Sequence, residues 1–193
     1  IINISRVITW ILIKLDNIIK WPEEESLIAA AQGFQNKRRI RNCIGAIDGS
    51  HITILQPQEN AADRKKNYSI ILQAVITANM RFTIYCDEPG SLHDAGITVV
   101  LRLHWESQNN KNGIFLNRMF ILGDSAYPSL SWLVLSFRNN DQLTKQQIEF
   151  NFIHSSTRMA IEKAFGVLKA RFRRLKFFNE YQDIQFIIEV VVA

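Results

Sequence analysis

Two short apolar runs in this sequence each lead to an aspartate beside a glycine. The run Met119–Leu122 leads through a glycine to Asp124, and the run Cys43–Ile47 leads directly to Asp48. Continuous apolar runs of this length are typical of strands that are buried on both faces of a sheet. An acid at the end of such a strand is held by a rigid backbone and stays reachable, so catalytic and metal-binding groups often lie there. Taken alone, each aspartate is better explained as a residue that caps a turn.

Length and composition indicate one globular domain. The 193 residues of the chain are enough for a domain that buries roughly 70% of its unfolded surface. A hydrophobic content of 47% with 21% charged residues is not that of a disordered chain. The net charge of +5 and the pI of about 9.4 favour a polyanionic partner, nucleic acid first, although many enzymes are equally basic.

Three further features concern the compartment of the protein, its relation to a membrane and the extent of the chain. Cys43 and Cys86 are far apart and belong to no Cys-x-x-Cys pattern, so we expect buried thiols in a reducing compartment. No signal peptide is evident, and charged residues interrupt the apolar opening segment too often for a membrane span. The apolar start and end of the chain lead us to expect a piece of a longer protein, truncated at its C-terminus.

The hydrophobic periodicity predicts an α/β fold around a mixed sheet. Apolar helical stripes before and after Pro22 predict a helical lead-in over residues 1–36. Along the rest of the chain we expect a strand at residues 43–55 and an antiparallel hairpin formed by residues 68–77 and 81–86. A helix at 94–105 and two strands at 119–122 and 131–137 should follow. Two helices at 144–152 and 157–175 should end the domain. The first strand is expected to turn at Asp48-Gly49 and to continue as extended chain.

Asp48, Asp124 and Glu162 are the candidate metal ligands. Glu162 follows Ile161 at the edge of the apolar stripe of the last helix, so it can face the edge of the sheet. Mg²⁺ and Mn²⁺ prefer carboxylate oxygens, and two such ions about 3.5–4 Å apart can activate the attacking oxygen and stabilise the leaving oxygen of a phosphodiester. Arg158, one helical turn before Glu162, either forms an exposed ion pair with it or contacts a phosphate near the metals.

Four blocks of the sequence resemble the PIF/Harbinger transposase family, which includes the domesticated Harbinger-derived nucleases. The blocks are Gly45–Ile52, Pro89–Asp94, Leu122–Pro128 and Arg158–Phe172, and they occur in the order in which the family has them. The resemblance implies a ribonuclease-H-like fold with a mixed sheet flanked by helices. It also implies an Asp-Asp-Glu triad that binds two divalent ions, Mg²⁺ or Mn²⁺, for DNA strand cleavage and transfer.

The resemblance also implies roles for individual residues. Asp48, Asp124 and Glu162 fall on the triad blocks, which makes them both the catalytic and the metal-binding residues. His93 and Asp94 match a further block, which gives them a supporting role at the edge of the site, with helix capping by Asp94 as the alternative.

Domain organisation and partners follow from the same resemblance. Residues 1–36 resemble the end of the family's N-terminal helical region, and residues 37–193 resemble its nuclease domain. The implied partners are double-stranded DNA and a separate DNA-binding accessory protein, without a membrane. The implied location is the nucleus, with the cytoplasm as a second compartment.

Basic residues crowd the end of the last predicted helix, just beyond Glu162. Such a run is usually a solvated helix face, and a track along a DNA backbone explains it about equally well. The residues that we expect to contact the backbone are Lys169, Arg171, Arg173 and Arg174.

Two functions from different classes therefore stand side by side. The leading hypothesis is a metal-dependent DNA endonuclease or transposase catalytic domain. The alternative is a domesticated, catalytically inactive copy that binds DNA or a protein partner. Three departures from the family pattern favour the alternative: no glycine at the turn Asn79-Met80, Ala95-Gly96 in place of an arginine, and Ser131 in place of a proline. A ribonuclease acting on RNA or hybrids shares the same metal chemistry.

Overall fold

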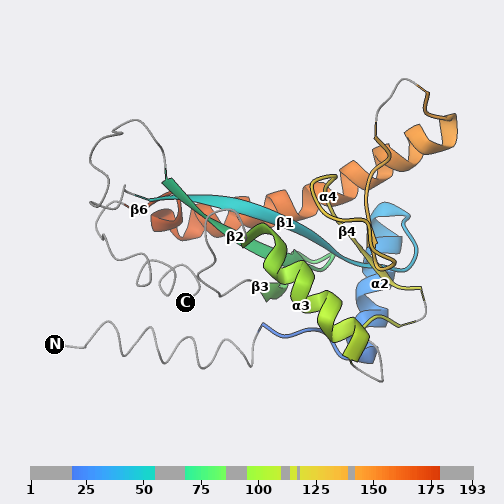
Figure 1. The fold of residues 1–193 in the computed structure, drawn as a ribbon, viewed down its shortest axis with the longest axis horizontal. Helices are drawn as coiled ribbons and strands as arrows, with labels where there is room; N and C mark the ends of the chain where they lie inside the picture. The colour runs from blue at the N-terminus through green and yellow to red at the C-terminus, as the bar shows by residue number, and fades with distance from the viewer. Residues whose placement is uncertain are drawn as a thin grey trace.

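The computed structural model describes residues 19–54, 68–85, 95–109, 114–116, 118–138 and 142–178. Within these residues the chain forms one six-stranded mixed sheet in the order β3-β2-β1-β4-β5, with β6 paired to β1 (Figure 1). The strands are β1 (Cys43–Ile54), β2 (Tyr68–Ile76), β3 (Phe82–Tyr85), β4 (Phe120–Leu122), β5 (Leu133–Val134) and β6 (Phe177–Phe178). The helices are α2 (Glu24–Arg38), α3 (Ala95–Asn109), α4 (Lys145–Arg171) and the short 3-10 helix η2 (Arg173–Leu175).

Helices cover both faces of the sheet. On one face α4 packs against the sheet through Ile161, and on the other face α3 packs through Leu103; both side chains are fully buried. Helix α2 contributes to both cores, through Phe34 on the α4 side and Leu27 on the α3 side. A mixed sheet between two helical layers confirms the expected ribonuclease-H-like α/β fold.

Strand β1 runs through the position where the sequence indicated a turn. The turn predicted at Asp48 and Gly49 is wrong, because β1 pairs with all of β2 without a break. Gly49 lies opposite Gln73 in this antiparallel ladder, and a Cβ at Gly49 would come within 3.0 Å of Ile71 Cγ2. The glycine therefore serves close packing within the sheet rather than a change of chain direction.

Helix α4 is one helix where the sequence indicated two. The expected break lay between residues 152 and 157, where polar residues interrupt the apolar stripe. The hydroxyls of Ser156 and Thr157 both donate to the carbonyl oxygen of Ile153, at 3.0 and 2.7 Å, so these polar residues are accommodated inside a continuous helix. At the start of α4, Thr144 and Gln147 form a capping box that satisfies two backbone N–H groups.

The other expectations about the fold have mixed outcomes. The antiparallel hairpin is confirmed as β2 and β3, whereas the strand expected at residues 131–137 is only the short β5, and β6 was not predicted. Cys43 is buried, and burial raises the pKa of its thiol to about 12, so it is an unreactive core residue. None of the described helices is long and apolar enough to cross a membrane. Cys86 and residues 1–18 lie outside the described residues.

Candidate active site

The pairing of β1 with β4 brings two distant aspartates together. The parallel register aligns Ala46 with Leu122, and each of these is followed two residues later by an aspartate, Asp48 and Asp124. Ala46 and Leu122 both belong to the core on the α4 side of the sheet. Because side chains two residues apart in an extended chain share a face, both aspartates continue on that side. They meet where the β1–β4 pairing ends.

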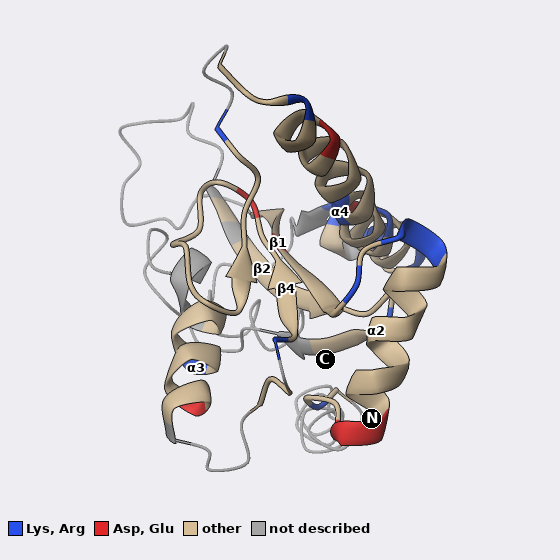
Figure 2. Ribbon diagram, turned by 90° about the vertical axis from the view of Figure 1, so that its right-hand side faces the viewer, with Lys and Arg blue, Asp and Glu red and all other residues tan. Residues whose placement is uncertain are grey.

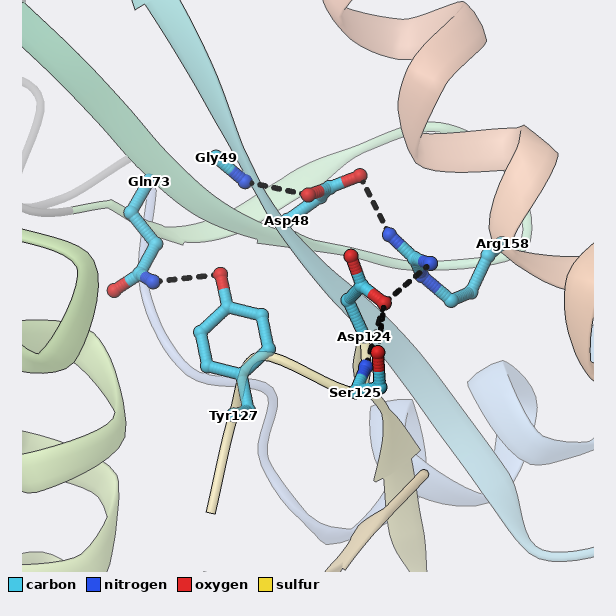
Figure 3. A network of polar contacts seen from close by, with 7 residues as sticks. All are labelled: Asp48, Gly49, Gln73, Asp124, Ser125, Tyr127 and Arg158. Carbon is cyan, nitrogen blue, oxygen red and sulfur yellow. Dashed lines mark hydrogen bonds and ion pairs between the residues drawn. The ribbon is translucent and has the colours of Figure 1, made fainter. Parts of the chain in front are cut away.

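A single guanidinium joins the two carboxylates (Figure 3). Arg158 of α4 donates from Nη2 to Asp48 Oδ2 at 2.8 Å, and its Nη1 lies 3.7 Å from Asp124 Oδ1. The side chains of Arg158 and Asp48 are 15% and 23% exposed, against 48% for Asp124, so the contact with Asp48 is the stronger of the two. The Nε of Arg158 is buried and has no hydrogen-bond partner among the described residues. One cationic side chain therefore bridges the two aspartates and is itself incompletely satisfied.

The turn after β4 fixes the position of Asp124. The backbone N–H and the hydroxyl of Ser125 both donate to Asp124 Oδ1, and the N–H of Tyr127 donates to the Asp124 carbonyl oxygen at 3.0 Å. Gly123 packs so closely that a Cβ there would lie 2.8 Å from Leu133 Cδ1. This close packing and these short-range hydrogen bonds hold the Asp124 carboxylate at the end of the strand.

A buried polar pair supports the site from the α3 side of the sheet. Gln73 of β2 is fully buried; its Nε2 donates to the Tyr127 hydroxyl oxygen at 2.7 Å, and its Oε1 accepts from the N–H of Val99 in α3 at 3.2 Å. The pair therefore connects the Asp124 turn with β2 (Figure 3), and Val99 extends the connection to α3. Sequence reasoning missed both residues as site residues. The available signal for Gln73 was a lone amide inside the apolar stretch 70–76.

Tyr127 lies within electrostatic range of Asp48, Asp124 and Arg158. Burial raises the pKa of its phenol to about 12, against the opposing effect of the hydrogen bond from Gln73. The negative charges of Asp48 and Asp124 raise this pKa further, and the positive charge of Arg158 lowers it. The phenol therefore keeps its proton at physiological pH and can act as a hydrogen-bond donor.

His154 is a second residue that the sequence did not single out. It lies one helical turn before Arg158, is buried, and places its Nε2 at 3.2 Å from the carbonyl oxygen of Val134. Because a carbonyl oxygen can only accept, Nε2 carries the proton. Burial lowers the pKa of His154, and the nearby positive charge of Arg158 also lowers it, while the hydrogen bond and the charge of Asp124 oppose the shift. The neutral imidazole ties α4 to β5.

Glu162 lies apart from the contact between Arg158 and the two aspartates. It is exposed on α4, one helical turn beyond Arg158, and forms no hydrogen bond or ion pair with other described residues. In the part of the chain that the structure describes, no group of three His, Cys, Asp or Glu side chains could hold a metal ion. The assignment of Asp48, Asp124 and Glu162 as catalytic and metal-binding residues therefore stays a prediction.

Only part of the predicted basic run Lys169, Arg171, Arg173 and Arg174 has side chains that the structure describes. Lys169 donates to the carbonyl oxygen of His51 at 2.6 Å, and partial burial lowers the pKa of its ammonium group. Arg171 and Arg173 are exposed. The assignment of this group to a DNA backbone stays a prediction. The predicted residues outside the described part are His93, Asp94 and the side chain of Arg174.

The chemistry of the two aspartates fits a divalent cation. Carboxylate oxygens are the ligands that Mg²⁺ and Mn²⁺ prefer in proteins. Both carboxylates already lie within ion-pairing distance of one positive group, so their separation is compatible with a shared cation. Glu162 would have to turn toward them to complete the predicted set of three.

The chain is similar to known proteins over most of its length. The family model described as DDE superfamily endonuclease matches residues 47–193. The chain is 32% identical to "Protein ALP1-like" of Arabidopsis thaliana, over 80% of this chain and 41% of that protein. It is 29% identical to "Putative nuclease HARBI1" of Bos taurus, over 89% of this chain and 49% of that protein. The chain therefore spans less than half the length of these relatives, and no solved structure matches it significantly.

Proposed function

We propose that this chain, which belongs to the DDE superfamily endonuclease family and carries a nuclease-type domain, cleaves DNA with the help of divalent metal ions. The observation that carries the proposal is the convergence of Asp48 and Asp124 on one cationic group, Arg158. Two acids from distant parts of the sequence, brought side by side on rigid backbone, are what a shared metal ion requires.

Each of the three acids, and Arg158, has a role in the proposed mechanism. Asp48 and Asp124 would hold one divalent ion, and Glu162 would complete the set for a pair of Mg²⁺ or Mn²⁺ ions. When bound, such ions activate an attacking oxygen and stabilise the leaving oxygen of a phosphodiester. Arg158 would exchange part of its contact with the aspartates for a contact with a nonbridging phosphate oxygen, which suits the planar guanidinium.

Double-stranded DNA is the proposed substrate. The net charge of +5 favours a polyanion, and Figure 2 displays basic positions on α4 and at the C-terminal end of α2. Lys169, Arg171, Arg173 and Arg174 would follow the DNA backbone beyond the acids. The accessory DNA-binding protein and the nuclear location expected from the family resemblance are part of the same proposal.

One observation favours a second candidate function. Glu162 is exposed and forms no ion pair with the other described residues, so the three acids do not yet form one ligand set. A domesticated protein that binds DNA or a protein partner without cutting would tolerate this arrangement. The two candidates differ in a single measurable property, which is metal-dependent strand cleavage.

Cleavage of supercoiled plasmid DNA by the purified protein separates the two candidates. With Mg²⁺ or Mn²⁺ the protein should convert supercoiled DNA into nicked circles, and Asp124→Asn should abolish nicking while the melting temperature stays close to that of the parent. Glu162→Gln should abolish it as well. Glu149→Gln is the matched control, because Glu149 is also an exposed acid on α4 and lies outside the cluster.

The outcomes separate the candidates cleanly. Nicking that survives in Asp124→Asn would reject the active site. An inactive parent protein that still binds DNA would favour the binding function.

A further inference from the structure

The orientation of the buried amide of Gln73 follows from two hydrogen bonds to other described residues. Its Oε1 accepts from the backbone N–H of Val99, and a backbone N–H can only donate. The opposite end of the amide, Nε2, must therefore face the Tyr127 oxygen, 2.7 Å away, and must donate to it. Exchanging the two ends of the amide would set two donors against each other at Val99, at a cost that a buried group does not tolerate.

This orientation decides what the Tyr127 hydroxyl can do. Its oxygen is an acceptor in the bond from Gln73, so its own proton is directed elsewhere. Within the described residues the phenol forms no second hydrogen bond. The side chain as a whole is only partly buried.

The location of this free donor is the important point. Figure 3 shows the Tyr127 ring on one side of Asp48 and Asp124, with Arg158 on the other side. Tyr127 interacts electrostatically with all three of these charged groups. Because β4 ends before Asp124, a phosphodiester held at the two carboxylates by a cation would have the guanidinium on the α4 side and the phenol on the α3 side.

We propose that the Tyr127 hydroxyl donates a hydrogen bond to a nonbridging oxygen of the substrate phosphodiester, and that Gln73 is the positioning residue that orients this hydroxyl. This inference rests on the proposed function, since it assigns a substrate contact at the same site. No bond to Tyr127 forms or breaks: the phenol keeps its proton and contributes only a fixed donor. A donor that is already oriented stabilises charge that builds on the phosphate during reaction, without reorganising first.

A purely structural role for Tyr127 is the competing explanation. In that case the hydroxyl only fastens the Asp124 turn to β2, and its loss would act through stability. Tyr127→Phe separates the two roles, because it removes the hydroxyl and keeps the ring. Thr83→Val is the matched control: Thr83 is buried, its hydroxyl donates to the Val75 carbonyl oxygen at 3.2 Å, and it belongs to β3, at the far edge of the sheet from β4.

The test combines three measurements on the purified protein: single-turnover cleavage of a DNA duplex in Mg²⁺, binding of the same duplex in Ca²⁺ by fluorescence anisotropy, and thermal unfolding. Tyr127→Phe should reduce the cleavage rate constant about tenfold to hundredfold, as expected for a donor to a charged oxygen, and should weaken DNA binding. Its melting temperature should fall no more than that of Thr83→Val, which should cleave like the parent. Gln73→Met should lose a similar factor in cleavage, and should add no further loss to Tyr127→Phe.

Three results would overturn the inference. The first is cleavage and DNA binding by Tyr127→Phe at parental levels. The second is a loss of activity that comes with a fall in melting temperature well beyond the control. The third is an additive effect of Gln73→Met on top of Tyr127→Phe. If Gln73→Met does not fold, Tyr127→Phe alone still decides.

Failure of the proposed function would be recognised separately. If the parent protein does not cleave, the nuclease proposal fails, and the binding measurement then decides on Tyr127. Weaker DNA binding by Tyr127→Phe would support the contact with phosphate, and equal binding would overturn it.

Discussion

Replacing Arg158 by glutamine should destabilise the metal-free protein by about 2 kcal/mol. The bond to Asp48 is short, 2.8 Å, and sheltered, and a hydrogen bond between charged groups contributes about 1.5–3 kcal/mol. The contact with Asp124 is longer, 3.7 Å, and its carboxylate is half exposed, so it adds no more than about 1 kcal/mol. Removing the buried Nε of Arg158, which has no hydrogen-bond partner in the described part of the chain, offsets about 1 kcal/mol of this loss.

Thermal unfolding in a buffer with chelator measures this change directly. For a chain of this length, a loss of 2 kcal/mol should lower the melting temperature by about 4–8 °C. Arg102→Gln is the matched control: Arg102 pairs with Glu106 at 3.2 Å within α3, but the two side chains are 55% and 29% exposed. Loss of such a helical surface pair should change the free energy of unfolding by less than about 0.5 kcal/mol.

Adding Mn²⁺ then tests whether the two aspartates hold a cation. Without Arg158, the two carboxylates face each other with no positive partner from α4, so a divalent ion should bind the variant more tightly than the parent. Because a ligand stabilises only the state that it binds, the melting temperature of Arg158→Gln should rise more steeply with Mn²⁺ concentration. The reasoning is refuted if Arg158→Gln shifts the melting temperature as little as Arg102→Gln, or if Mn²⁺ stabilises parent and variant equally.

Two further predictions concern stability. Gly45→Ala should destabilise the protein by about 1–3 kcal/mol in urea titrations, because the added Cβ would lie 2.8 Å from Val75 Cγ1. Gly166→Ala should stabilise α4 by up to about 1 kcal/mol, because a Cβ added there meets no neighbouring side chain within 4 Å. Equal effects of the two substitutions would contradict the packing argument. The pKa of His154 is lowered by burial, so as the pH falls below about 6.5 the unfolded state binds a proton that the folded state refuses, and the free energy of unfolding falls. His154→Gln should lose less stability than the parent between about pH 7 and pH 5, and parallel curves would contradict the assignment.

Local patterns were sufficient to predict most strands of the sheet and to place two acids at or near strands. Short apolar runs predict buried strands because few other structures can absorb them, and an acid directly after such a run must lie at the strand's end or face. Asp48 and Asp124 lie together because β1 and β4 pair in parallel with Ala46 opposite Leu122. No single segment of the sequence encodes this register. The mistaken turn at Gly49 had the same origin, because the crowding by Ile71 that favours a glycine comes from a neighbouring strand.

The supporting residues were beyond sequence reasoning because their roles depend on tertiary contacts. Gln73 and Tyr127 are 54 residues apart and come from a strand and a turn, so nothing local indicates that they share a hydrogen bond. His154 lies in a polar stretch that resembled a helix break, whereas α4 continues through this stretch and buries His154 beside Val134. Burial and hydrogen bonding change the meaning of a polar residue, and both are properties of the folded chain.

The packing of α4 restricts how Glu162 can reach the two aspartates. Four residues advance an α-helix by about 6 Å, so a slide of one turn would bring Glu162 to the present place of Arg158. Ile161 and Ala164 are buried against the sheet at 0% and 3% exposure, and such a slide would pull them out of the core at a cost of several kcal/mol. Glu162, in contrast, is exposed and unpaired among the described residues, so its side chain can rotate at little cost. The core therefore disfavours a slide of α4, so the proposed metal-binding state would have to form by movement of the side chains of Arg158 and Glu162 alone.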